Sequence, residues 1–97
     1  MKEFHLERYD GFFEAICRLS RVEDCRRFFE DICTIKEIED ISGRLDVARL
    51  LREGKSYQEV SKLTGASTAT ISRVNKCLNY GAGGYALVLD PEEEKNG

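Results

Sequence analysis

The residues best suited to chemistry in this chain lie in the stretch GASTATISRVNK, at positions 65–76. Read as a helix, one face and its flanks carry small, hydroxylated and basic side chains: Thr68, Ala69, Thr70, Ser72, Arg73 and Lys76. Methyl and hydroxyl groups can contact DNA base edges, and an arginine can bind guanine or a phosphate. The stretch therefore predicts a helix that lies in a groove of double-stranded DNA.

Another helix is predicted at 57–64. It precedes the helix at 68–80 and is separated from it by a very short turn, so the two would form a pair in which 57–64 is the first helix and 68–80 the second. Ser61 is the small residue that such a pair needs midway along its first helix, where the second helix packs. Gly65 follows four positions later and can adopt the positive φ that a tight turn requires. Ile71 and Val74 point inward on the second helix. This spacing predicts a helix-turn-helix motif.

The start of the motif offers further groups for the DNA backbone: Lys55, Ser56, Tyr57, Gln58 and Lys62. Residues 42–80 hold 7 basic and 3 acidic side chains, although the whole chain has a net charge of −3. The motif thus lies in the one basic segment of an acidic protein, which favours a polyanionic partner.

The sequence shows no residue pattern typical of catalysis, metal binding or membrane insertion. The sequence contains no triad with a histidine partner and no phosphate-binding glycine loop, so we expect no enzyme. Its four cysteines form no CxxC pair and His5 is the single histidine, so we expect no metal and no cofactor. No apolar run approaches the ~20 residues of a membrane span, and the N-terminus is charged. We expect a cytoplasmic protein with reduced thiols and no membrane contact.

The whole chain is predicted to be all-α. Ser20, Thr34 and Ser56 each stand three residues before a glutamate, the pattern of a capping box. With apolar periodicity, these caps predict helices at 2–19, 21–33, 35–53, 57–64 and 68–80. The helix over 35–53 carries an apolar stripe and is expected to be central; the stripe comprises Ile38, Ile41, Leu45 and Ala48. Gly54 is expected to end that helix, and Ser67 to cap the last one.

Residues 1–80 are expected to form one helical domain, with dimerisation helices in 1–54 and the helix-turn-helix in 55–80. A glycine-rich linker and an acidic tail follow at 81–97, of which 90–97 are expected to be disordered. Residues 85–89 fit either a strand-like arm or an extra turn packed on the body. All five phenylalanines lie in the first 29 residues. They fit either the core of one chain or an apolar surface that a second copy covers.

Several segments resemble the Trp repressor superfamily: TIKE at 34–37, SGR at 42–44, LLREG at 50–54 and STATISRVN at 67–75. NKCLNYGAGGY at 75–85 also resembles its YerC/YecD-type branch. The resemblance implies an intertwined homodimer whose first three helices interlock. It also implies two helix-turn-helix units that bind a palindromic operator, with half-sites about one helical turn apart.

The superfamily's corepressor, tryptophan, has candidate contacts here only by this resemblance. Arg73 would pair with its carboxylate, Arg44 would stack on the indole, and Thr34 would line the pocket. Val74 stands where the Trp repressor has the glycine that leaves room for the indole, and Cys77 replaces a serine. A filled position cannot hold an indole without costly repacking. We therefore expect that tryptophan is not the effector, and the sequence leaves open whether another small molecule is.

Two functions follow from these features. The first is a dimeric, sequence-specific DNA-binding regulator, a repressor by analogy with the superfamily. The second is a protein-interaction module that kept the fold and lost strong DNA binding, as the net charge of −3 and the tail sequence DPEEE would favour. DNA binding must weaken steeply with salt, by a slope of about −0.9 per phosphate contacted, whereas an apolar protein interface weakens far less.

Overall fold

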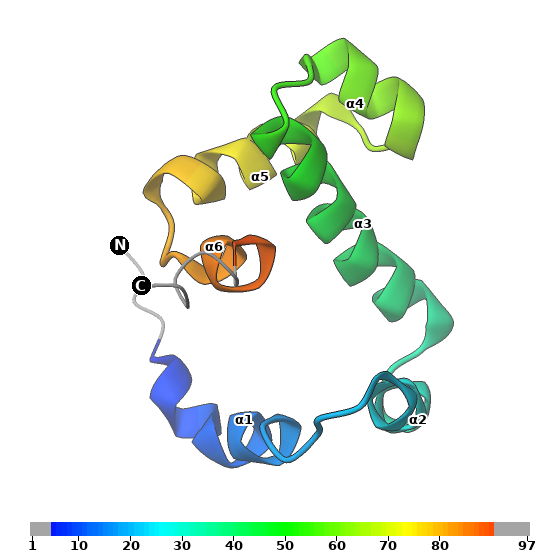
Figure 1. The fold of residues 1–97 in the computed structure, drawn as a ribbon, viewed down its shortest axis with the longest axis vertical. Helices are drawn as coiled ribbons and strands as arrows, with labels where there is room; N and C mark the ends of the chain where they lie inside the picture. The colour runs from blue at the N-terminus through cyan, green and yellow to red at the C-terminus, as the bar shows by residue number, and fades with distance from the viewer. Residues whose placement is uncertain (1–4, 91–97) are drawn as a thin grey trace. The chain divides into compact units, whose positions relative to one another are not determined.

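A computed structural model describes residues 5–90, and all regular structure in that range is helical, as predicted (Figure 1). The elements are the 3₁₀ helix η1 (Leu6–Tyr9) and the α-helices α1 (Asp10–Ile16), α2 (Val22–Ile32), α3 (Ile35–Arg52), α4 (Tyr57–Thr64), α5 (Thr68–Tyr80) and α6 (Gly84–Leu89). The expected helical start at residue 2 and the acidic residues 91–97 lie outside the described residues. The chain divides into two compact units, residues 1–35 and 36–97, and each is described by itself.

The N-terminal unit corrects the prediction of one continuous helix over residues 2–19. In its described part η1 leads into α1, which ends at Ile16 rather than at Leu19. The backbone N–H groups of Arg18 and Leu19 donate to the carbonyls three residues earlier, at 3.1 and 3.0 Å. Such short-range bonds tighten the last turn of a helix. The chain has therefore left the α-helix before Leu19.

The start of α2 corrects a second prediction, because Ser20 is not its N-cap. The N-cap is Arg21, whose backbone is extended and whose side chain makes no capping hydrogen bond. The N–H groups of Asp24 and Cys25 donate to the Arg21 carbonyl at 3.1 and 3.0 Å, which starts the helix one residue later than a Ser20 cap requires. Arg21 Nε donates instead to Asp24 Oδ2 at 3.2 Å.

An aromatic cluster joins α1 to α2 and consists of Phe12, Phe13, Phe28 and Phe29. Its ring centroids lie 5.5 Å apart for Phe12 and Phe13, 6.5 Å for Phe12 and Phe28, and 5.2 Å for Phe28 and Phe29. None of the described residues in η1, α1 and α2 is buried, and Phe12 is 41% exposed. The rings therefore contact one another while leaving apolar surface open to solvent.

The core of the C-terminal unit is formed where α3, α4 and α5 meet (Figure 1). Its buried side chains come from all three helices: Val47, Ala48, Val60, Ile71 and Val74. The apolar stripe predicted along α3 is only partly buried, because Ala48 lies in this core while Ile41 is 54% exposed. The second half of α3 is thus the half that the motif helices cover.

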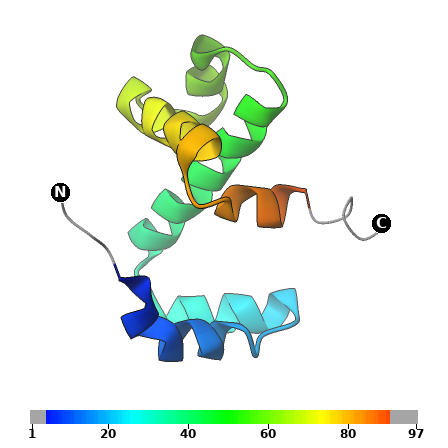
Figure 2. The ribbon, with the colours of Figure 1, turned by 90° about the vertical axis from the view of Figure 1, so that its left-hand side faces the viewer.

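Residues 85–89, which the sequence left open between an arm and a packed turn, form α6. Figure 2 shows this helix extending from the end of α5. Tyr85 and Leu89 pack against the core, and an ion pair between Arg52 and Asp90 links the ends of α3 and α6. The connection contains Gly83 at φ 86°, a backbone conformation that side chains with a Cβ rarely adopt.

A Gly81→Ala substitution is expected to lower the free energy of unfolding by roughly 0.5–3 kcal/mol, the usual range for a destabilising point change. A Cβ at this position would lie 2.5 Å from the Cys77 carbonyl oxygen, and that oxygen accepts the hydrogen bond that closes α5. Urea unfolding followed by circular dichroism measures the loss. The matched control is Gly84→Ala, where a Cβ meets nothing within 4 Å; equal effects of both changes would contradict the steric explanation.

Candidate nucleic-acid interface

The first helix of the predicted motif, α4, begins with the capping box that the sequence predicts. Ser56 Oγ accepts a hydrogen bond from the Glu59 backbone N–H at 3.1 Å, and Glu59 Oε1 accepts one from the Ser56 N–H at 2.9 Å. Two free N–H groups of the helix end are thus satisfied by side chains. The cap fixes the first turn of α4, from which the side chains of Tyr57 and Gln58 extend.

The turn between α4 and α5 is held by hydroxyl groups as well as by Gly65. Gly65 has φ 79°, and its N–H donates to the Ser61 carbonyl at 2.8 Å. Ser61 Oγ donates to the Ala66 carbonyl at 3.0 Å, while Thr64 Oγ1 donates to the Val60 carbonyl at 2.7 Å. Sequence reasoning used Ser61 only as a small residue and missed both hydroxyl bonds. They fix the turn that sets α5 against α4.

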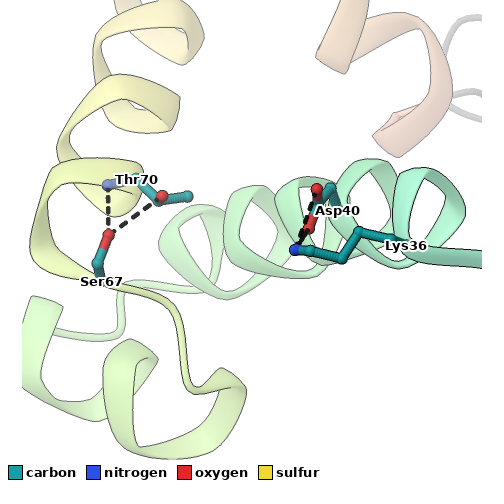
Figure 3. A network of polar contacts seen from close by, with 4 residues as sticks. All are labelled: Lys36, Asp40, Ser67 and Thr70. Carbon is teal, nitrogen blue, oxygen red and sulfur yellow. Dashed lines mark hydrogen bonds and ion pairs between the residues drawn. The ribbon is translucent and has the colours of Figure 1, made fainter.

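The N-terminus of α5 is capped by Ser67, as predicted. Its oxygen accepts a hydrogen bond from the Thr70 N–H at 3.2 Å, and its hydroxyl donates to Thr70 Oγ1 at 3.2 Å (Figure 3). Figure 3 also shows the Lys36–Asp40 ion pair on α3, with 3.1 Å between Nζ and Oδ1. Thr70 is half-buried, so it is set apart from the exposed face of α5.

The outer face of α5 is exposed over its whole length, whereas Ile71 and Val74 are buried on the opposite side. The exposed residues are the small or hydroxylated Thr68, Ala69 and Ser72, followed by Arg73 and Lys76. Small side chains at the N-terminal end allow the helix backbone to approach a groove floor closely. The cations lie further along, where a DNA backbone would pass. The structure thus places five of the six predicted residues of this helix on one accessible surface.

The cations of the predicted interface keep their charges unpaired. Lys55, Lys62, Arg73 and Lys76 are exposed, and within residues 5–90 none of them forms an ion pair. Of the other cations in the described part of this unit, Lys36, Arg49 and Arg52 pair with aspartates, whereas Arg44 forms no ion pair within residues 5–90. Four of the five unpaired cations in the described part of this unit thus lie on α4, on α5 or in the turn before α4, where they can bind phosphate groups.

A small hollow separates the first turn of α4 from the start of α5. It has a volume of about 310 Å³ and is lined by Tyr57, Gln58, Ser61, Lys62 and Thr68. Four of these residues were predicted to contact DNA. Their shared position could not be inferred from sequence, because it depends on how α4 crosses α5. Side chains of both helices therefore border the same hollow.

Within residues 5–90 no group of three or more His, Cys, Asp or Glu side chains could hold a metal ion. The same part of the chain contains no helix with the length and hydropathy needed to cross a membrane. All four cysteines are free thiols, and Cys17 and Cys77 are exposed.

Comparison with known proteins places this arrangement in a family. The family model described as Trp repressor protein matches residues 7–93. The chain belongs to the Trp repressor family. It is 53% identical over 85 residues to the uncharacterized protein YerC of Bacillus subtilis (strain 168), covering 88% of this chain and 82% of YerC. The crystal structure of a TrpR-like protein from Eubacterium eligens matches with a TM-score of 0.83 at 47% identity, covering 88% of each chain. The family is one of DNA-binding regulators rather than enzymes.

The position at which the Trp repressor has glycine is filled in this member of the family. Val74 is 1% exposed and belongs to the core with Val47 and Ile71. Its isopropyl group therefore contacts the side chains that hold α5 against α3. A Trp repressor-like pocket behind α5 would need this side chain to leave the core.

Two of the positions expected by resemblance to form a ligand site, Arg44 and Cys77, line different hollows of the C-terminal unit. Arg44 and Thr70 line a hollow of about 350 Å³, which Arg73 does not line. Cys77 lines a different, more apolar hollow of about 440 Å³. Thr34 belongs to the N-terminal unit and is exposed.

Proposed function

We propose that this protein is a cytoplasmic transcriptional repressor that binds double-stranded DNA as a homodimer. In each copy α4 and α5 act as a helix-turn-helix, with α5 in the major groove. The observation that carries the proposal is the exposed face of α5, where small and hydroxylated residues precede two unpaired cations. The choice of repressor over activator follows the family to which the chain belongs.

Base contacts in this proposal come from the N-terminal part of α5. The methyl groups of Thr68 and Ala69 suit thymine methyls, Ser72 can bond to several bases, and Arg73 can bind guanine through two hydrogen bonds. Thr70 contributes chiefly by holding the helix start, because its hydroxyl is bonded to Ser67. Phosphates are bound by Lys55 and Lys62, which precede α5 in the chain, and by Lys76 on α5 itself.

The dimer is supported by the apolar surface that one copy leaves open. No described residue before α3 is buried, and large side chains such as Val22 and Ile32 are 71% and 49% exposed. A chain of 97 residues rarely leaves so much apolar surface in water unless a partner covers it. A second copy with the same surface is the simplest such partner, since homodimers bury matching patches.

The repressor is proposed to bind DNA without tryptophan. By the resemblance, Val74 stands where the Trp repressor has the glycine that leaves room for the indole ring, and in this chain its side chain is buried in the core that holds α5. The DNA-reading helices would be positioned by this packing alone, or by a different small molecule. The hollow lined by Arg44 and Thr70 is large enough for a small metabolite.

Selection from a pool of random duplexes without added ligand tests the proposal. A homodimeric helix-turn-helix protein should enrich a palindrome whose half-site centres lie about 10 base pairs apart. The affinity for that site should fall steeply with salt, by about 0.9 log units per log unit of salt for each phosphate contacted. Failure to enrich any sequence, with or without tryptophan, would refute DNA recognition and favour a protein-interaction module.

An Arg73→Ala variant is expected to lose about 1–3 kcal/mol of binding free energy for the selected site. Arg73 is exposed and forms no ion pair in the described part of the chain, so its removal should leave helicity and stability unchanged. Fluorescence anisotropy with labelled duplexes measures the affinity. The control is Arg49→Ala on α3, which removes a cation already paired with Asp46 at 2.6 Å. Unchanged affinity for Arg73→Ala would remove this residue from the interface.

A further inference from the structure

The hollow between α4 and α5 contains one side chain that is unusually well suited to reading a base. Gln58 is exposed on the first turn of α4, and its amide forms no hydrogen bond within residues 5–90. It lines the same hollow of about 310 Å³ as Thr68, the first residue of α5. A molecule in contact with the start of α5 is thus also within reach of Gln58.

The remaining polar groups of the hollow cannot supply comparable selectivity. Ser61 Oγ is committed to the turn, since it donates to the Ala66 carbonyl at 3.0 Å. Lys62 is a flexible point charge, which suits phosphates rather than base edges. The hydroxyl groups of Tyr57 and Thr68 can each donate or accept, so they do not distinguish one base edge from another.

Gln58 differs because its side-chain amide presents a donor and an acceptor side by side. Adenine presents the complementary pair in the major groove, with N7 as acceptor and the N6 amino group as donor. A phosphate group only accepts hydrogen bonds, so a glutamine bound to phosphate would leave its carbonyl oxygen without a donor at the interface. The chemistry of the amide therefore favours a base edge over the backbone.

Building on the proposed function, we infer that Gln58 reads one adenine in each operator half-site. The first helix of the motif then contributes to sequence choice as well as to phosphate binding. The capping box fixes the backbone from which Gln58 extends, because Ser56 and Glu59 on both sides of it are bonded to each other. A side chain on so fixed a turn loses less conformational freedom when it binds.

Selection from random duplexes with wild-type protein, Gln58→Ala and Gln58→Arg tests this inference. The wild-type palindrome should contain one adenine per half-site whose preference disappears in Gln58→Ala, while every other position is unchanged. Affinity for the wild-type site should fall by about 5- to 150-fold per half-site, as expected for one bidentate base contact. Gln58→Arg should select guanine at the same position, since arginine matches guanine O6 and N7.

Lys62→Ala is the matched control, because it changes the same hollow without removing the amide. It should keep the wild-type consensus, weaken binding to all sequences alike, and reduce the salt slope by about 1 per half-site. Thermal melting checks that all variants are folded.

The possible results distinguish failure of the Gln58 inference from failure of the proposed function on which it rests. A Gln58→Ala variant that selects the full wild-type consensus would overturn the role of Gln58 and leave the proposed function standing. Loss of preference for a base other than adenine would overturn the adenine assignment. If the wild-type protein selects no palindrome, the proposed function and this inference both fail.

Discussion

A Phe28→Ala variant is expected to weaken the proposed homodimer, so that it sediments as a monomer at concentrations at which we expect the wild-type protein to be dimeric. Phe28 is one of the two inner rings of the aromatic cluster, with its centroid 6.5 Å from that of Phe12 and 5.2 Å from that of Phe29. Truncation of a buried phenylalanine costs about 3–5 kcal/mol. If the partner copy completes the burial of this ring, dimerisation should weaken by roughly two to four orders of magnitude for each copy that carries the substitution.

Analytical ultracentrifugation over a concentration series measures the dimerisation constant. The matched control is Arg26→Ala on the same helix, because Arg26 is exposed and forms no ion pair within the described residues; this variant should stay dimeric. DNA affinity should fall together with dimerisation, since two linked helix-turn-helix motifs bind a palindrome far more tightly than one motif does. An unchanged dimerisation constant for Phe28→Ala would show that the aromatic cluster lies outside the interface.

The parts of the fold predicted well from sequence are those whose ends are set by local hydrogen bonds. The bounds of α4 and α5 match the predicted 57–64 and 68–80. Ser56, Gly65 and Ser67 act through contacts within a few residues, so their types alone mark the helix ends. The longest helix was predicted over 35–53 and observed over Ile35–Arg52 for the same reason, with Gly54 at φ 91° just beyond it.

Prediction failed where local signals compete or where packing over a distance decides. Ser20 and Arg21 both stand where α2 could begin, and the capping-box pattern cannot show that the chain starts the helix at the later residue. The helix α6 has only six residues and no side-chain cap, so little in its own sequence favours it. Tyr85 and Leu89 stabilise it by packing against a core made by other segments.

In the candidate interface, too, the features set by local sequence were predicted, and those set by packing between helices were not. Helical periodicity correctly separated the buried Ile71 and Val74 from the exposed Ser72 and Arg73. It could not show that the Thr70 hydroxyl is bonded to Ser67, because Thr70 lies at the edge of the predicted face. The hollow that contains Gln58 arises between two helices, and a pattern read along one helix cannot reveal it.

A Val74→Gly variant is expected to lose roughly 3 kcal/mol of unfolding free energy. About 2 kcal/mol come from the removed methyl groups and the cavity that they leave. About 1 kcal/mol comes from glycine inside a helix. Val74 is 1% exposed and shares the core with Val47 and Val60, so the surrounding side chains have little room to collapse inward. For a domain of this size the loss corresponds to a fall in melting temperature of about 12–24 °C.

The same variant tests why tryptophan is not expected to act on the wild-type protein. If the Val74 side chain alone excludes the indole, tryptophan should raise the melting temperature of Val74→Gly and leave that of the wild-type protein unchanged. A ligand present at 100 times its dissociation constant stabilises a protein by about 2.7 kcal/mol, which would restore most of the lost stability. Val47→Ala is the matched control, because it removes methyl groups from the same core at a fully buried position on α3. It should melt earlier without responding to tryptophan. A folded Val74→Gly variant that still ignores tryptophan would mean that steric exclusion by Val74 is not the reason, since the space behind α5 would then be open and the ligand still absent.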